Sequence, residues 1–459
     1  MALKFGTSGL RGLVTEMTPE AVAQYTLAFL SACDSGAVLC VGRDLRPSSP
    51  RIADNVIAAA RQAGMRVINC GPVPTPALAL AAQAHGGGAV MVTGSHIPAD
   101  RNGLKFYTSA GEITKADETA ILSSVSTIPS EAQETLAALD ADDQAEARFI
   151  ARYVATFGPT ALKGQRIGLY AHSAVGRDIL AQILSSLGAV VIEVGRSDVF
   201  IPVDTEAVDQ ATRAQIREWV KTHKLDALVS TDGDSDRPLL ADEAGTIVPG
   251  DIMGQITADA LGAEVVVTPV SSNSGVTLKG FEAVIRTRIG SPFVIAGMEA
   301  ASGAVVGYEA NGGFLLGFEA CGPVGPIAPL MTRDCTLPLL AVLYAAMDSS
   351  VAARVAKEPP VVTLSDRLQE VPQEKSQLLI ARLLEDAAAR TAFLTPLGKT
   401  EVALDLTDGL RMILKDGAVV HIRSSGNAPE LRVYVETQDL SSAQELLGEV
   451  LIRLQLLLV

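Results

Sequence analysis

The sequence predicts an α/β fold with three tandem α/β domains on mixed, mostly parallel sheets, and a smaller C-terminal α+β domain, around a central cleft. The length of 459 residues suggests about three domains. Short apolar strand patterns alternate with helical patterns in three successive runs, and alternating order of this kind builds mostly parallel sheets. The last hundred residues instead carry short strands separated by Asp-Gly pairs, which are typical of antiparallel hairpins.

The first run contains three strands and two helices. The first helix begins at Ser49-Pro50 and stops at Gly64, because proline suits the first turn of a helix and glycine its end. We expect strands at 37–41, 65–70 and 89–92, and the second helix at 76–84. The last strand leads into the polar segment Thr93-Gly-Ser-His-Ile-Pro.

The same order recurs twice, and each run again ends in a polar loop. The second run has expected strands at 166–170, 190–194 and 225–229 and helices at 178–187 and 207–222. The third has strands at 264–267, 283–285 and 304–307, a short helix after Ser274 and a helix at 292–301. Ligands bind at the carboxyl ends of strands in open α/β sheets, so the three polar loops are expected to converge on one cleft.

The C-terminal region is expected to form an antiparallel sheet closed by a helix from about Ser441. Asp408-Gly409 and Asp416-Gly417 mark its hairpins. Its strands are expected at 402–406, 410–414, 419–422 and 431–435, and the linkers at 131–146 and 357–363. The predicted domains are 1–147, 148–249, 250–362 and 363–459.

Composition narrows the class of partner. The chain has 37 Lys and Arg against 52 Asp and Glu, a net charge of −15, and no basic run, which argues against nucleic acid or an anionic membrane surface. Its five cysteines form no C-x-x-C pair, and no signal peptide or 20-residue apolar stretch is visible. We therefore expect a cytoplasmic protein, a monomer or small homo-oligomer, with a small-molecule partner.

Three aspartates predict a cation site. Asp232, Asp234 and Asp236 alternate directly after an apolar strand, so their carboxylates can converge on one hard divalent cation. An EF-hand loop is excluded because Arg237 stands where that loop needs glycine. A solvated acidic turn is the alternative, although three close carboxylates repel one another unless a cation neutralises them.

Ser95 is the candidate nucleophile. A serine hydrolase needs G-x-S-x-G, and Ile97 stands where the second glycine belongs. A hydroxyl that carries a phosphoryl group, with the cation neutralising charge, fits better. An ordinary turn, with His96 as a structural loop residue, is the alternative.

Two further segments suit a sugar phosphate. Arg423-Ser-Ser-Gly-Asn-Ala-Pro-Glu-Leu-Arg432 offers two guanidinium groups, two hydroxyls and backbone N–H groups, which a phosphate dianion needs. Glu309 and Asn311 precede two glycines and suit sugar hydroxyls. A hairpin with incidental arginines and a plain polar loop are the alternatives.

Taken together, these segments resemble the α-D-phosphohexomutase superfamily. The match runs from residue 5 to residue 432 in the family's order, and five ordered segments are highly specific. They are Phe5-Gly-Thr-Ser-Gly-Leu-Arg-Gly12, Gly42-Arg-Asp-Leu-Arg-Pro47, Thr93-Gly-Ser-His-Ile-Pro98 with Asn102-Gly-Leu-Lys105, Asp232-Gly-Asp-Ser-Asp-Arg237 and Arg423-Ser-Ser-Gly-Asn-Ala-Pro429.

The resemblance implies a phosphohexomutase that interconverts hexose 6-phosphate and hexose 1-phosphate through a phosphoserine at Ser95. It also implies Mg²⁺ as cofactor and a hexose 1,6-bisphosphate as intermediate and activator. The implied catalytic residues are Ser95, Arg11, Lys105 and His96, and the implied Mg²⁺ ligands are Ser95, Asp232, Asp234 and Asp236. The implied substrate-binding residues are Glu309, Asn311, Arg237, Arg288, Arg423, Ser424, Ser425, Gly426, Asn427 and Arg432.

Several positions depart from the family pattern. Ile97, Asn427 and Ala428 replace the usual Asn, Thr and Glu, and Glu309-Ala-Asn-Gly-Gly replaces Glu-x-Ser-Gly-His. The segment from Arg288 is similar to that of phosphomannomutase-like members, so mannose is expected, with glucose also accepted. Phosphoglucosamine mutase, a phosphoserine-linked phosphatase and a non-catalytic sugar-phosphate-binding protein are the alternatives.

Overall fold

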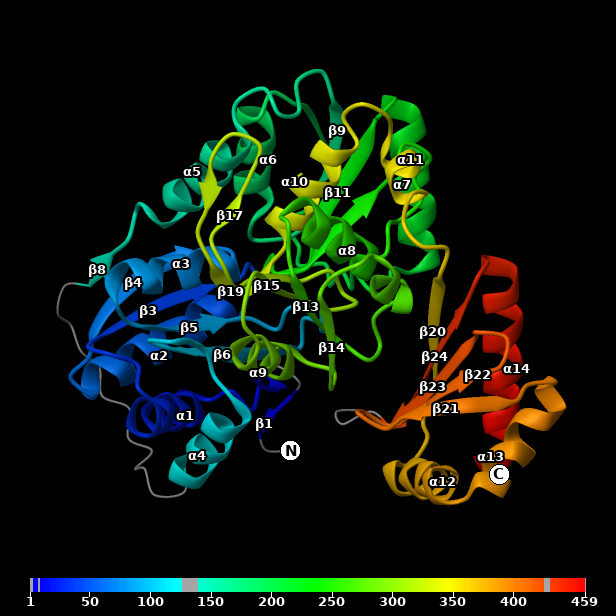
Figure 1. The fold of residues 1–459 in the computed structure, drawn as a ribbon. Helices are drawn as coiled ribbons and strands as arrows, with labels where there is room; N and C mark the ends of the chain where they lie inside the picture. The colour runs from blue at the N-terminus through cyan, green and yellow to red at the C-terminus, as the bar shows by residue number, and fades with distance from the viewer. Residues whose placement is uncertain (1–2, 7–8, 126–138, 425–429, 459) are drawn as a thin grey trace.

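The computed structural model describes residues 3–6, 9–125, 139–424 and 430–458. It confirms three α/β units followed by a smaller α+β unit (Figure 1). Their principal sheets have eight, four, five and five strands, and the first three mix parallel and antiparallel pairs.

The first sheet is covered by helices on both faces. Helices α1 (Pro19–Ala32), α2 (Ser49–Gln62) and α4 (Lys115–Val125) pack on one face, and α3 (Thr75–His85) and α5 (Ala145–Phe157) on the other. The strand order is β1 (Lys4–Phe5), β2 (Leu10–Leu13), β6 (Arg101–Thr108), β5 (Gly88–Val92), β3 (Val38–Arg43), β4 (Arg66–Pro72) and β8 (Asp140–Ala141), with β7 (Gly111–Glu112) on β6.

All five elements predicted for the first run are present, but α1 and β6 were not predicted. The sequence does contain a start signal for α1. Thr18 caps the helix by accepting a hydrogen bond from the Ala21 N–H at 3.3 Å, and Pro19 follows it. Strand β6 mixes charged, glycine and apolar residues, since it lies inside the sheet while also serving the site.

The strands and helices predicted for the second and third runs are all present. The second sheet runs β10 (Val190–Val194), β9 (Arg166–Tyr170), β11 (Ala227–Thr231) and β12 (Pro238–Ala241), between α6 (Arg177–Ser186) and α7 (Gln210–His223). The third runs β14 (Ala283–Thr287), β13 (Val265–Pro269), β15 (Val305–Tyr308), β16 (Phe314–Leu316) and β19 (Leu330–Asp334). Around it lie α8 (Gly250–Ala260), η1 (Ser274–Leu278), α9 (Ser291–Ala300), α10 (Thr336–Ala345), α11 (Val351–Val355) and the small pair β17 (Ala320–Cys321) and β18 (Pro326–Ile327).

The C-terminal sheet is antiparallel, and its helices pack on one face only. Gly409 and Gly417 adopt φ of +84° and +83° in the two predicted hairpins. The strand order is β20 (Val362–Leu368), β24 (Leu431–Thr437), β23 (Val419–Ser424), β22 (Leu410–Leu414) and β21 (Glu401–Asp405). The helices are α12 (Gln373–Glu385), α13 (Ala387–Leu394), η2 (Thr395–Leu397) and α14 (Leu440–Leu458).

The predicted linkers were partly wrong. β8 and the start of α5 fall inside 131–146, and β20 begins within 357–363.

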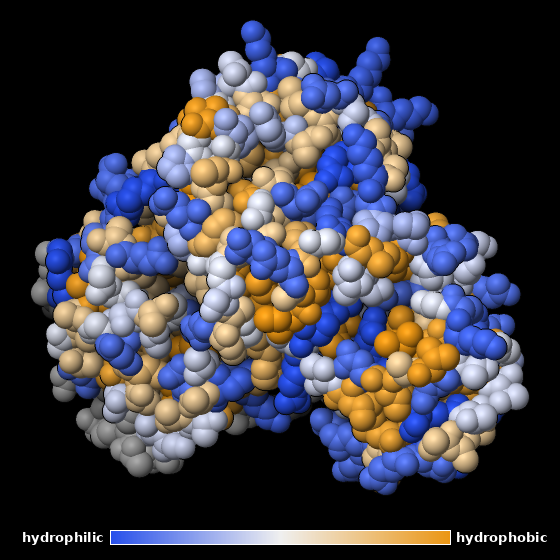
Figure 2. All heavy atoms as spheres, in the orientation of Figure 1, coloured by the Kyte–Doolittle hydropathy of each residue, from blue (hydrophilic) through white to orange (hydrophobic). Residues whose placement is uncertain are grey.

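The three α/β units pack closely against one another, for example through Tyr107 Oη and Thr332 Oγ1 at 3.1 Å. The C-terminal unit stands to one side in Figure 1, and Figure 2 shows a notch between it and the rest.

Candidate active site

The three predicted loops meet at the ends of β5, β11 and β15. Ser95 Oγ, which follows β5, donates to Asp232 Oδ2 after β11 at 2.5 Å. Arg333 on β19 then joins Asp236 to Glu309, which follows β15. The convergence expected from strand order is therefore confirmed.

Ser95 is held in an unusual backbone conformation. Its φ is +52°, a left-handed value that costs an L-residue energy unless its surroundings fix it. Arg46, fully buried, donates to the carbonyls of Ser95 at 2.8 Å and Ile97 at 2.6 Å, and also to those of Pro98 and Arg101. Asp44 forms an ion pair with Arg46 and accepts from Thr93 Oγ1 at 2.8 Å. The Asp44–Arg46 pair therefore holds the loop that carries Ser95 in this conformation.

The three aspartates form a buried cluster that fits a hard cation. One carboxylate oxygen from each of Asp232, Asp234 and Asp236 lies within 4.8 Å of the others. The Oδ1 atoms of Asp234 and Asp236 are buried and have no hydrogen-bond partner among the described residues. Burial and then the two neighbouring carboxylates raise the pKa of Asp232 well above its usual value. Unsatisfied buried oxygens beside like charges favour a bound divalent ion.

Two basic side chains come from the first domain. Lys105 Nζ on β6 lies 2.5 Å from both Asp234 Oδ2 and Asp236 Oδ2, and Thr75 Oγ1 donates to the same Asp234 oxygen at 2.7 Å. Arg11 lies on β2, which pairs with β6. Burial, followed by the positive charges of Arg237 and Arg333, lowers the pKa of Arg11 to about 10.

His96 and Arg237 contact each other beside Ser95. Arg237 Nη1 donates to His96 Nδ1 at 3.1 Å, and Ser95 Oγ is 3.3 Å from the same nitrogen. Burial, then Arg237 and Arg11, lowers the pKa of His96 to about 2. His96 is therefore a neutral hydrogen-bonding group at physiological pH rather than an effective base.

Glu309 and Asn311 occupy one tight turn. Asn311 Oδ1 accepts from the Gly313 N–H at 3.0 Å, and Gly313 O accepts from the Glu309 N–H at 3.1 Å. Arg333 Nη1 contacts Glu309 Oε2 at 3.2 Å. The Asn311 side chain is thus held by its own loop, and the Glu309 side chain is held by Arg333 of a neighbouring strand.

The predicted phosphate-binding residues lie on the C-terminal sheet. Arg423 and Arg432 face each other across β23 and β24, on the face opposite the helices, because neighbouring Ile422, Leu431 and Val433 belong to the helix-covered core. Ser424 ends β23. Ser425, Gly426 and Asn427 lie outside the described residues.

Arg288 is not brought into the carboxylate cluster. Its guanidinium lies 5.2 Å from the Phe293 ring centre, and the next residue, Ile289, donates its N–H to Asp408 Oδ2 of the C-terminal domain at 2.9 Å. Arg288 thus marks the junction between the third and fourth domains.

Sequence reasoning missed several residues that order the site. Arg46 and Asp44 stood in a quoted motif without a role, and Thr75 and Arg333 carried no motif signal. Such residues act through contacts between distant segments, which spacing along the chain does not reveal.

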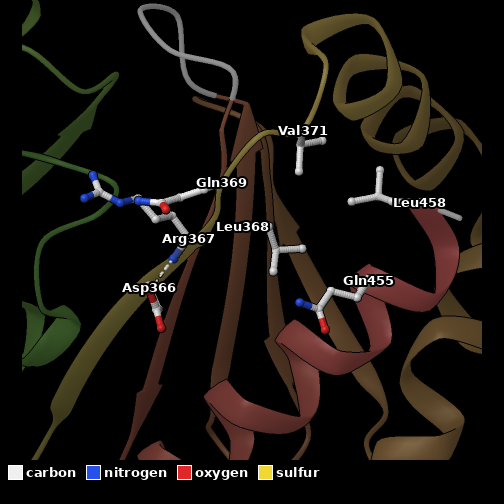
Figure 3. A pocket seen from close by; sticks show the side chains of 7 residues that line it. All are labelled: Asp366, Arg367, Leu368, Gln369, Val371, Gln455 and Leu458. Carbon is white, nitrogen blue, oxygen red and sulfur yellow. Dashed lines mark hydrogen bonds between the residues drawn. The ribbon is translucent and has the colours of Figure 1, made fainter.

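A separate groove of about 750 Å³ lies in the C-terminal domain between β20 and the end of α14 (Figure 3). It contains none of the predicted site residues. Its lining is Asp366, Arg367, Leu368, Gln369, Val371, Gln455 and Leu458.

Among the helices that the structure describes, each is too short or too polar to cross a bilayer.

Comparison with known proteins identifies the family. Four family models of phosphoglucomutase/phosphomannomutase match in order: α/β/α domain I at 2–132, domain II at 147–245, domain III at 249–362 and the C-terminal domain at 369–452.

Individual relatives cover nearly the whole chain. A phosphomannomutase from Sinorhizobium fredii is 44% identical over 465 residues, covering 98% of each chain. A phosphoglucosamine mutase from Symbiobacterium thermophilum is 27% identical with the same coverage. The solved structure of a phosphoglucomutase/phosphomannomutase family protein from Burkholderia thailandensis superposes with a TM-score of 0.78 at 19% identity, covering 98% of this chain and 97% of the other. The chain belongs to the phosphoglucomutase/phosphomannomutase family of phosphohexomutases.

Proposed function

We propose that this phosphohexomutase interconverts mannose 6-phosphate and mannose 1-phosphate and also accepts the glucose phosphates. The contact of Ser95 Oγ with a buried aspartate triad carries the proposal, because a hydroxyl that would carry a phosphoryl group then lies beside carboxylates that would hold a cation. The 44% identity to a phosphomannomutase supports mannose over glucosamine as substrate.

The reaction proposed for the resting phosphoserine has two balanced transfers. First, the bond between Ser95 Oγ and phosphorus breaks as a sugar hydroxyl forms its own bond to phosphorus and loses its proton. The resulting hexose 1,6-bisphosphate then reorients. In the second transfer Ser95 Oγ bonds to the other phosphorus as the bond between that phosphorus and the sugar oxygen breaks, and this oxygen takes up the proton lost in the first transfer. Added bisphosphate would act as activator by phosphorylating any free Ser95.

The side chains have distinct proposed roles. Asp232, Asp234 and Asp236 would hold Mg²⁺, which neutralises charge on the transferring phosphoryl group. Arg11 and Lys105 would stabilise charge and assist proton transfer, and Arg237 would support the loop.

At the substrate's other groups, Glu309 and Asn311 would hold sugar hydroxyls. Arg423, Ser424 and Arg432, with 425–427, would bind the phosphate that is not reacting.

The unpaired cysteines of the structure fit a reducing cytoplasm.

A coupled assay tests the substrate class. Purified protein is given the 1-phosphates of mannose, glucose, glucosamine and N-acetylglucosamine, with Mg²⁺ or with a chelator. We expect the highest kcat/KM for mannose 1-phosphate, a measurable rate for glucose 1-phosphate, and loss of both rates with chelator. An equal kcat/KM for glucosamine 1-phosphate would contradict the mannose preference.

Variants and phosphate release separate the alternatives. Ser95→Ala should lower kcat by at least about a thousandfold, whereas Ser185→Ala, at an exposed position of α6, should leave it unchanged. Stoichiometric release of inorganic phosphate without isomer would instead indicate a phosphatase. Binding without either reaction would indicate a binding protein.

A further inference from the structure

Arg333 bridges the two loops that carry the proposed cation and sugar contacts. It lies on β19 and is 3% exposed. Its Nε and Nη2 contact Asp236 Oδ2 at 3.0 and 2.7 Å, and its Nη1 contacts Glu309 Oε2 at 3.2 Å. One planar guanidinium thereby fixes one carboxylate of the second domain and one of the third.

Gly313 provides the space through which the Arg333 side chain passes. A Cβ added at Gly313 would lie 2.7 Å from Arg333 Cδ and 2.8 Å from Cγ, closer than carbon atoms pack. The backbone of Gly313 does not have a positive φ, so its conformation is open to other residues. The glycine is therefore matched to the arginine stem beneath the Glu309–Gly313 turn.

The two oxygens of Asp236 have different surroundings. Oδ2 accepts from both Lys105 and Arg333, whereas buried Oδ1 has no hydrogen-bond partner among the described residues and lies 3.7 Å from Arg237 Nε. Arg333 therefore fixes the Asp236 carboxylate while it holds the Glu309 carboxylate in place. A shift of either loop must move the shared guanidinium.

We propose that Arg333 is a positioning residue that couples cation binding to sugar binding. This inference rests on the proposed function, which assigns the cation to the Asp236 loop and the sugar to the Glu309 loop. Because Asp236 and Glu309 share one guanidinium, a cation that orders Asp236 also orders Glu309. Such coupling is reciprocal, so the sugar phosphate tightens cation binding by the same factor.

Calorimetry tests the coupling without turnover. In a Ser95→Ala background, the Kd of mannose 1-phosphate is measured with and without saturating Mg²⁺. We expect Mg²⁺ to lower this Kd at least about fivefold. The ratio of the Kd without Mg²⁺ to the Kd with Mg²⁺ is the coupling factor. It should be smaller in Arg333→Lys, which keeps the charge but cannot bond both carboxylates as the planar guanidinium does, and it should be about one in Arg333→Ser.

Arg390→Lys is the matched control, since Arg390 is also buried and paired, with Glu401 at 2.6 Å in the C-terminal domain. It should keep the full factor. A factor of one with Arg333 intact, or an unchanged factor in both Arg333 variants, would overturn the coupling. Failure of the proposed function would look different: an intact coupling factor, but no isomerisation of any hexose phosphate by the protein that retains Ser95.

A double-mutant cycle tests the pairing with Gly313. Gly313→Ala should weaken mannose 1-phosphate binding in the presence of Arg333, because the new Cβ displaces the arginine stem. In the Arg333→Ser background the same change should add little, since the stem is gone. Additive losses of affinity in the two variants would contradict the pairing. Circular dichroism of each variant checks that the chain remains folded.

Discussion

At the residue scale, the structure assigns two buried histidines to supporting the site loops. His172 Nε2 lies 2.7 Å from the carbonyl of Thr231, which precedes the aspartate triad. His421 Nε2 lies 2.6 Å from the carbonyl of Asp408. Each imidazole must carry a proton on Nε2 to donate this bond, and burial lowers the pKa of both rings to about 4, so both are neutral hydrogen-bond donors at pH 7.

The His421 side chain gives a pH-dependent contribution to stability. Burial lowers its pKa to about 4 from 6.5, so the unfolded chain binds the proton more tightly than the folded one. The stabilisation is complete above pH 6.5 and is lost as pH falls toward 4. Between pH 7.5 and 5.0 the loss is about 2 kcal/mol.

We therefore expect the free energy of unfolding of the wild-type C-terminal domain to approach or fall below that of His421→Gln at pH 5.0. At pH 7.5 the variant should be less stable by about 1 kcal/mol, the value of the lost bond. Urea unfolding at both pH values measures the difference. His223→Gln, at the half-buried end of α7, is the control. A pH-independent difference between wild type and His421→Gln would show that His421 does not titrate as described.

At the scale of elements, the two Asp-Gly hairpins differ in what surrounds their glycines. Gly417 has open space, whereas a Cβ at Gly409 would lie 2.6 Å from the Ile422 carbonyl. Both have positive φ, so Gly417→Ala should cost about 1 kcal/mol of stability and Gly409→Ala clearly more. Thermal unfolding of the two variants checks the order. Equal losses would mean that backbone strain alone governs both turns.

The elements also show how far sequence reasoning reaches. Strands such as β9, β10 and β22 were predicted to the residue, because their apolar runs end at turn signals. β6 and β20 were not predicted, since their charged residues obscure the strand period. Ser95 and the aspartates were predictable from local spacing. Arg333 was not, because its function depends on two loops that only the folded chain brings together.

At the scale of the whole molecule, net charge gives little information about the site. The chain carries −15 overall, yet Arg11, Lys105, Arg237 and Arg333 gather around the buried aspartates. The second basic group, Arg423 and Arg432, lies on another domain. An anion with two charged ends therefore needs the C-terminal domain to lie at a suitable distance from the first three.

Asp408 links the C-terminal domain to the third domain and so helps to set this distance. Its Oδ2 accepts from the Ile289 N–H at 2.9 Å, and its Oδ1 lies 3.7 Å from Arg423 Nε. Asp408→Ala removes this interdomain bond and the ion pair with Arg423 together, so we expect KM for the hexose phosphate to rise about tenfold, as loss of one charged hydrogen bond predicts. The kcat should change less, because the Ser95 loop and the aspartates are untouched.

Asp416→Ala is the matched control, since Asp416 opens the other Asp-Gly hairpin and pairs only with Lys399, at 2.6 Å, among its described ion-pair partners. Steady-state kinetics and small-angle X-ray scattering of both variants separate the effects. Asp408→Ala should raise KM and enlarge the radius of gyration, because its interdomain contact is lost. Asp416→Ala should do neither. Identical kinetics for the two variants would show that the Asp408 contact does not place the C-terminal domain, and that the proposed phosphate contacts of the arginines on β23 and β24 form without it.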